Sequence, residues 1–80
     1  MNKQLKSADL FFKEGTSDKV YSAQVVQVSA KEAVVNFQFG RRGNTLNSNT
    51  KTPTPVPVAE AEEIFNELVA SKVKKGYQPA

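Results

Sequence analysis

The sequence predicts an α+β domain in which an antiparallel β-sheet of three to four strands packs against one C-terminal helix. Apolar and polar residues alternate through residues 33–40, which is typical of a strand with one buried face and one wet face. Residues 58–75 repeat apolar residues at three- and four-residue steps, which places one apolar stripe along a helix. The simplest packing sets this stripe against the apolar face of the sheet.

Two further strands are expected before the alternating one, at residues 10–13 and 19–28. The second of them is rich in β-branched and aromatic residues, which suit a pleated surface. Gly15–Asp18 lies between them, and its glycine and short polar side chains favour a tight turn. Met1–Ser7 is polar, and we expect this segment to be frayed.

The segment that follows the alternating strand allows two interpretations. Residues 45–52 are rich in Thr and Asn and fit either a fourth strand or a long loop. Pro53, Pro55 and Pro57 then occupy every second position. Proline has no N–H to donate, so this stretch is excluded from a central strand, and we expect a sheet edge or a polyproline-like connector.

Residues at both ends of the helical stripe support a helix over residues 58–75. Pro57 suits the first helical turn, and Gly76 suits the left-handed position after the last turn. Tyr77 can then fold back onto the helix end. Acidic residues near the beginning and lysines near the end complement the helix dipole: Glu60, Glu62 and Glu63, then Lys72, Lys74 and Lys75.

Length and composition exclude several classes of protein. Eighty residues fit one domain, which we expect to span residues 1–80 with its core at about 10–77. The chain has no Cys and no His, which excludes disulfides and thiolate or imidazole zinc ligands. No segment approaches the roughly 20 apolar residues of a membrane helix. No apolar run follows the basic N-terminus as in a signal peptide, so we expect a cytoplasmic protein without a membrane partner.

Catalytic chemistry has no support in the sequence. No histidine is present to activate a nucleophile, and the carboxylates do not form the shielded pair that acid–base catalysis requires. Gly40–Gly43 lacks the pattern of a phosphate-binding loop. We therefore expect no enzymatic activity, no cofactor, no metal and no small-molecule substrate.

Residues 37–43, with the sequence Phe-Gln-Phe-Gly-Arg-Arg-Gly, carry the clearest functional signal. Arg41 and Arg42 each present a planar fork of donors suited to phosphate. Gly40 lets a partner approach the backbone closely, and Phe39 can stack on a sugar or a base. The net charge of +3 and the pI near 9.3 are compatible with nucleic-acid binding but do not require it.

Packing offers a competing interpretation of the same residues. The alternation places Phe39 on the buried face with Phe37, which favours a position in the core. Arg41 has the same parity but follows Gly40, where the strand is expected to end, so its direction stays open. Lys19 and Lys51 are further candidates because they are expected near the same end of the sheet.

Phe39-Gly40-Arg41-Arg42-Gly43 resembles the signature of the WGR domain, which is Trp-Gly-Arg followed by an apolar residue and Gly. Asp18–Val26 is similar to the family's second strand, and Lys72–Tyr77 is similar to its closing Lys-x-x-x-Gly-Tyr. The resemblance runs from about Leu10 to Tyr77. Two positions depart from it, because Phe39 stands where the family has Trp and Arg42 stands where it has an aliphatic residue.

The resemblance implies a function for the signature residues. In DNA-dependent poly(ADP-ribose) polymerases it implies contact between DNA ends and the Trp and Arg positions, which are Phe39 and Arg41 here. The chain is also similar to short bacterial proteins that consist of a WGR domain alone. We therefore expect a DNA end- or nick-binding module that uses Phe39, Gly40, Arg41, Arg42, Lys51 and Lys19.

Two other functions stay open at this point. The first is a protein-interaction or regulatory module that does not bind nucleic acid, in which the Pro- and Thr-rich connector offers an edge for strand addition. The second is a self-associating structural protein that uses an unpaired sheet edge. The sequence leaves the oligomeric state undetermined.

Overall fold

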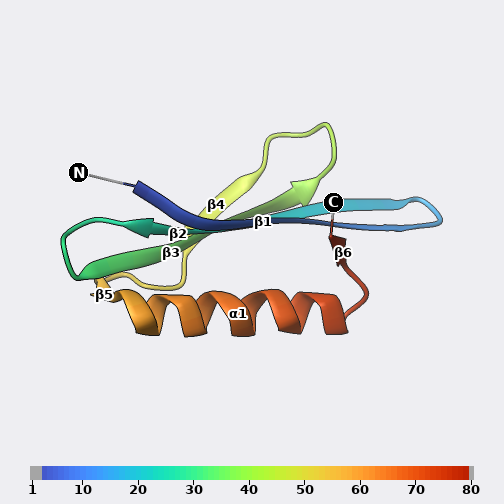
Figure 1. The fold of residues 1–80 in the computed structure, drawn as a ribbon. Helices are drawn as coiled ribbons and strands as arrows, with labels where there is room; N and C mark the ends of the chain where they lie inside the picture. The colour runs from blue at the N-terminus through green and yellow to red at the C-terminus, as the bar shows by residue number, and fades with distance from the viewer. Residues whose placement is uncertain (1–2, 80) are drawn as a thin grey trace.

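The computed structural model describes residues 3–79, which form one antiparallel sheet and one helix. Figure 1 shows helix α1 lying along one face of the sheet, while no second layer covers the other face within the described residues. No helix in this part of the chain is long and apolar enough to cross a membrane. The elements are β1 Lys3–Glu14, β2 Ser17–Gln27, β3 Glu32–Arg41, β4 Asn47–Thr50, β5 Val56–Pro57, α1 Val58–Lys74 and β6 Gln78–Pro79.

The α+β class with an antiparallel sheet and one C-terminal helix is confirmed, but the sheet is larger than predicted. Its strand order is β4-β3-β2-β1-β6, and β5 pairs with the beginning of β3. The additional strands, β5 and β6, have two residues each, and both contain a proline. Elements this short show no alternation of apolar and polar residues, so the sequence pattern could not reveal them.

The prediction that Met1–Ser7 is frayed is wrong for Lys3–Ser7, which belongs to β1. Gln4 lies opposite Val26 and Ser7 lies opposite Gln24, so these polar residues continue the pairing with β2. The register shifts between Gln4 and Lys6, and Leu5, at this irregularity, packs against the core. Backbone pairing with a long neighbouring strand holds the segment despite its polar composition. Met1 and Asn2 lie outside the described residues.

The polar segment after β3 contains a strand, β4, rather than a long loop. The end of β4 and the residues just after it form hydrogen bonds with both backbone groups of Val35, its N–H and its C=O. The Val35 N–H donates to Thr52 Oγ1 at 2.9 Å, and Val35 O accepts from the Lys51 N–H at 2.8 Å and from Thr50 Oγ1 at 3.0 Å. Thr52 is 4% exposed, so a buried hydroxyl satisfies a buried backbone donor.

The proline-rich connector lies at the margin of the sheet, as expected from its missing donors. Val56–Pro57 pairs with Ala33 and Glu32, and the Val58 N–H then donates to Lys31 O at 3.1 Å. Pro57 is the N-cap, immediately before the first helical residue. The connector thus fixes where α1 begins relative to β3.

The core lies between the helix and the central strands. Three helical side chains, Ala61, Phe65 and Leu68, are buried against the sheet. Each fully buried aliphatic or aromatic side chain stabilises the fold by about 1.5–3 kcal/mol. The sheet contributes Leu10, Tyr21, Ala23, Val25, Ala33 and Val35.

The helix ends in a turn that returns the chain to the sheet. The Tyr77 N–H donates to Lys72 O at 3.1 Å, and the Gly76 N–H donates to Val73 O at 3.0 Å. This pair of bonds is the Schellman motif, and Gly76 has the positive φ of +109° that the motif requires. A Cβ at Gly76 would lie 3.0 Å from Cε2 of the Phe12 ring. The turn therefore presses the chain against β1 and brings Tyr77 over the sheet.

We expect Gly76→Ala to destabilise the protein by more than the roughly 1–2 kcal/mol that a left-handed residue costs. The added Cβ would crowd the Phe12 ring, and this cost adds to the cost of a side chain at positive φ. Gly15→Ala is the matched control, because Gly15 has φ +59° and nothing within 4 Å of its added Cβ. Urea unfolding of both variants measures the difference, and equal losses of unfolding free energy would contradict the close contact.

Candidate functional site

Four aromatic rings gather on the helix-facing side of the sheet, near the C-terminal end of α1. Tyr21 and Phe39 lie opposite each other on β2 and β3, with ring centroids 6.4 Å apart. Phe37 is 5.6 Å from Tyr21 and 5.9 Å from Phe39. The C-terminal turn adds Tyr77, whose ring lies 6.1 Å from Tyr21. We call these four residues the aromatic cluster.

Exposure differs sharply within the aromatic cluster. Tyr21 is 3% exposed, whereas Phe39 is 38% exposed. The prediction that Phe39 belongs to the core is therefore wrong, although its parity with Phe37 is correct. Beyond Leu68 the helix presents Lys72 and Lys75 to this region instead of apolar side chains, so the sheet face is left partly open.

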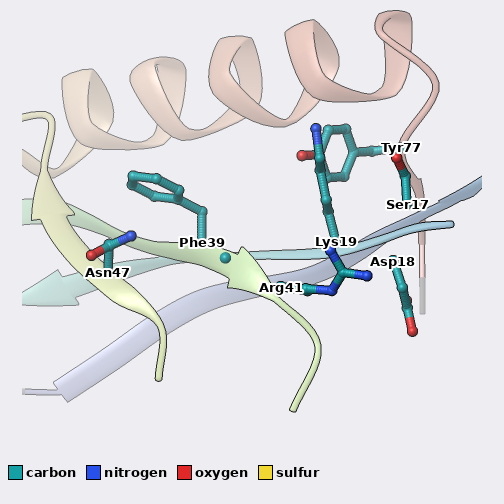
Figure 2. Close-up of a pocket in the computed structure, with 8 residues that line it drawn as sticks. Ser17, Asp18, Lys19, Phe39, Arg41, Asn47 and Tyr77 are labelled. Carbon is teal, nitrogen blue, oxygen red and sulfur yellow. The ribbon is translucent and has the colours of Figure 1, made fainter. Parts of the chain in front are cut away.

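Two open depressions meet at the aromatic cluster, and both are lined by Phe39 and Tyr77. The first, of about 360 Å³, is the Arg41 depression, drawn in Figure 2. It is also lined by Ser17, Asp18, Lys19, Gly40, Arg41 and Asn47. The second, of about 310 Å³, is the Lys72 depression, which carries Lys51, Lys72 and Lys75. Phe39 thus borders two depressions that each carry cations.

The lysines of the Lys72 depression lie close to the rings. Lys72 Nζ is 4.7 Å from the centroid of Tyr21 and 5.9 Å from that of Tyr77. Lys51 Nζ is 5.5 Å from the centroid of Phe37. Burial lowers the pKa of Lys72 below its ordinary value, and the ammonium groups of Lys75 and Lys51 lower it further. A site with this excess of positive charge favours an anion.

Lys19 and Arg41 come together as the sequence suggested, because they are directly opposed in the β2–β3 register. Arg41 Nη2 donates to Thr16 O at 3.1 Å, which holds the guanidinium near the β1–β2 turn. Figure 2 shows Lys19 pointing toward the end of the helix, while Asp18 points away from it. Arg41 is the last residue of β3 and lines the Arg41 depression. The direction of its side chain, which the sequence left open, is therefore toward this depression.

Arg42 does not join this group. Its Nε donates to Asp18 Oδ1 at 3.0 Å, and its side chain lines a different depression beside Val20 and Ser22, on the opposite face of the sheet. The pair is solvent-accessible, with side-chain exposures of 55% and 31%, so it stabilises the fold by about 0–1 kcal/mol. The expected pairing of Arg41 with Arg42 at one site is therefore not found.

Gly40 has a local role in the fold. A Cβ at this position would lie 3.1 Å from Leu46 Cδ2. The absence of a side chain thus lets the loop after β3 cross close to the strand, before β4 begins. The close approach that the sequence suggested for a partner is made here by the protein's own loop.

Tyr77, Lys72, Lys75 and Asn47 also line the site, although none was a predicted site residue. The lysines were interpreted as complements of the helix dipole, and Tyr77 as a residue that packs on the helix end. The sequence predicted that Tyr77 folds back onto the helix end, but the residues that Tyr77 contacts depend on where β1 and β2 lie. Sequence spacing alone does not give that position.

The chemistry available at the site is stacking and anion attraction. Burial, assisted by the nearby Tyr77 phenol, raises the pKa of Tyr21 to about 12, so its hydroxyl stays neutral at physiological pH. Within residues 3–79, no group of three or more acidic side chains gathers to hold a metal ion. Planar rings beside uncompensated cations suit a ligand that is both flat and anionic.

Comparison with known families agrees with this geometry. The family model of the WGR domain matches residues 7–80. The chain belongs to the WGR domain family. In poly(ADP-ribose) polymerases the WGR domain is a nucleic-acid-binding module. No curated protein and no solved structure was found to match the chain. In this WGR domain the signature occupies the end of β3, with Phe39 and Arg41 facing the depression.

The raised pKa of Tyr21 makes stability depend on alkaline pH. The neutral phenol is favoured in the folded state, so this contribution is complete below about pH 10 and is lost as pH rises toward 12. Urea unfolding over this range is expected to show a steeper loss for the wild type than for Tyr21→Phe, which keeps the ring and removes the titrating group. Parallel curves for the two proteins would contradict the burial of the hydroxyl.

Proposed function

We propose that this WGR domain is a non-catalytic nucleic-acid-binding module that recognises DNA ends or nicks. The observation that carries the proposal is the exposed Phe39 ring, which borders two depressions that each carry cations. Arg41 and Lys19 line one of these depressions, and Lys51, Lys72 and Lys75 line the other. A DNA end exposes a terminal base beside phosphates, and a nick interrupts one strand so that the bases beside it can unstack. Both therefore offer the two groups that these residues are suited to bind.

Charge and stacking contribute differently to this binding. Lys and Arg that neutralise phosphates release counterions, so log K falls with log salt by about 0.9 for each contact on duplex DNA. Stacking of a base on an aromatic ring contributes about 1–3 kcal/mol and depends far less on salt. The five cations of the two depressions set an upper limit to the salt dependence, and Phe39 supplies the part that remains at moderate salt.

A non-catalytic role is consistent with the chemistry of the site. Tyr21 is buried, and its hydroxyl remains protonated near neutral pH. Asp18 borders the Arg41 depression, but its carboxylate points away from the helix and is bonded to Arg42. Neither group is therefore placed to act as a general base toward a bound substrate.

Two neighbouring arginines provide a matched test of the site. Arg41→Ala is expected to weaken DNA binding by about 5- to 30-fold at low salt, since a charge-assisted contact contributes about 1–2 kcal/mol. Arg42→Ala removes the same charge from the opposite face and is expected to change binding by less than about 2-fold, the effect of distant charge alone. Fluorescence anisotropy with labelled blunt, nicked and single-stranded DNA measures both variants.

Each result of this titration has a clear meaning. A loss of DNA affinity confined to Arg41→Ala, with a smaller salt slope, supports binding at the face that carries Phe39 and Arg41. Equal losses for both variants would show that net charge and not this site drives binding. A flat response of the wild type at low salt would contradict nucleic-acid binding altogether.

A protein-interaction module is the second candidate, and one feature of the sheet favours it. On the side of β1 away from β2, β6 pairs with Leu10 and Phe11 alone. The backbone of Lys3–Asp9 on that edge is therefore accessible for strand addition. Capture of partners from nuclease-treated lysate would test it, and a Ser7→Pro substitution at the edge, where the side chain is exposed, should then abolish capture while leaving DNA binding intact.

A further inference from the structure

We propose that the site at Phe39, where the Arg41 and Lys72 depressions meet, takes a single unpaired nucleotide and not the flat end of a stacked base pair. Such a nucleotide occurs in an overhang, in a gap or at a flipped-out position. This inference rests on the proposed nucleic-acid binding and specifies the class of nucleotide that the site accepts. It follows from the breadth of the exposed ring surface, the side chains around it and the placement of the cations.

The exposed stacking surface is narrow. Phe39 is 38% exposed, whereas Tyr21 is buried and Phe37 and Tyr77 are half-buried. A base pair consists of two hydrogen-bonded bases, and it needs a platform of comparable breadth to stack without losing contact. One phenyl ring matches one base, and Phe offers less surface than the Trp usual at this position in the family.

Side chains from two other elements lie on either side of the Phe39 ring. Figure 2 shows Phe39 rising from β3 toward the helix, with Tyr77 hanging from the helix end on one side and Asn47 of β4 on the other. The Schellman turn fixes Tyr77 through the bond from its N–H to Lys72 O. The space between these two side chains suits one extended base better than the breadth of a duplex end.

The polar group beside Phe39 suits the edge of a single base. Asn47 lies opposite Phe39 in the β3–β4 register and lines the Arg41 depression. Its amide offers two donors and an acceptor, so this side chain can bond the pairing edge of a base. That edge is accessible only when the base is unpaired.

The cations lie where a strand crossing Phe39 would carry its phosphates. Lys19 and Arg41 line one depression beside the ring, and Lys51, Lys72 and Lys75 line the other; Lys19 also lines a further depression with Lys72 and Lys75. A nucleotide inserted at Phe39 has a phosphate toward each neighbouring nucleotide, so both groups of cations can be used by one strand. This arrangement matches the combination of aromatic ring and basic groove found in single-strand binding.

The test compares labelled DNA duplexes that share one sequence and differ at their end: blunt, with a short 3′ or 5′ overhang, and with the same overhang made abasic. Wild-type protein is expected to bind an overhang about 5- to 150-fold more tightly than the blunt duplex, the factor corresponding to about 1–3 kcal/mol of stacking. The abasic overhang keeps the phosphates and should lose this gain. Equal affinity for the blunt and overhang duplexes would overturn the inference.

A second measurement does not depend on any variant. 2-Aminopurine placed in the overhang changes its fluorescence when it leaves the DNA stack and stacks on a protein ring. We expect a saturable change on binding, with the same midpoint as the anisotropy titration. Binding without any fluorescence change would show that no base enters the site at Phe39.

Phe39→Leu identifies the ring responsible, with Val73→Ala as the control. Phe39→Leu is expected to abolish the preference for overhangs and to leave the salt slope unchanged. Val73 is 46% exposed on the helix outside both depressions, so its substitution should leave the preference intact. If blunt and overhang duplexes bind equally and Arg41→Ala weakens both, the unpaired-nucleotide inference fails while the proposed function stands. If nothing binds at low salt, both fail.

Discussion

The apolar face of the sheet extends further along β2 and β3 than the apolar stripe of α1 can cover. Ala61, Phe65 and Leu68 are the buried helical side chains, and beyond them Lys72 of α1 and its C-cap Lys75 border the depression that Tyr21 and Phe37 line. The remaining aromatic surface is therefore bordered by lysine instead of being sealed by aliphatic side chains. Every property of the site, including its exposed ring, its positive charge and its open depressions, follows from this mismatch in length.

Leaving cations together in this way opposes stability. The pKa of Lys72 is lowered by its own burial and by Lys75 and Lys51, which means that the folded protein disfavours its charged form. The described part of the chain has one ion pair, between Arg42 and Asp18, and it lies on the other face of the sheet. A bound polyanion would relieve the repulsion, so the same charges that strain the free protein favour the complex. This coupling is typical of residues retained for binding.

The sequence predicted those features that depend on local periodicity and missed those that depend on where distant elements meet. The alternation of β3, the stripe of α1 and the glycine at its end each report a local backbone geometry, and all three are correct. Parity placed Phe39 on the helix-facing side, yet its exposure depends on where α1 stops in space. The pairing of Lys3–Ser7 depends on a neighbouring strand. Tyr77 reaches the cluster only because the Schellman turn returns it over β2.

The two departures from the family signature lie on opposite faces of the sheet and therefore act on different properties. Phe39 lies on the helix-facing side, in the proposed binding site, where its ring offers a smaller stacking surface than Trp. Arg42 lies on the other side, where its N–H donates to Asp18 O at 2.9 Å and its Nε bonds the Asp18 carboxylate. These bonds connect the end of β3 to the beginning of β2, next to Arg41 and Lys19. The replacement by Arg thus supports the geometry of the site without adding charge to it, while the replacement by Phe reduces the aromatic surface that the site exposes.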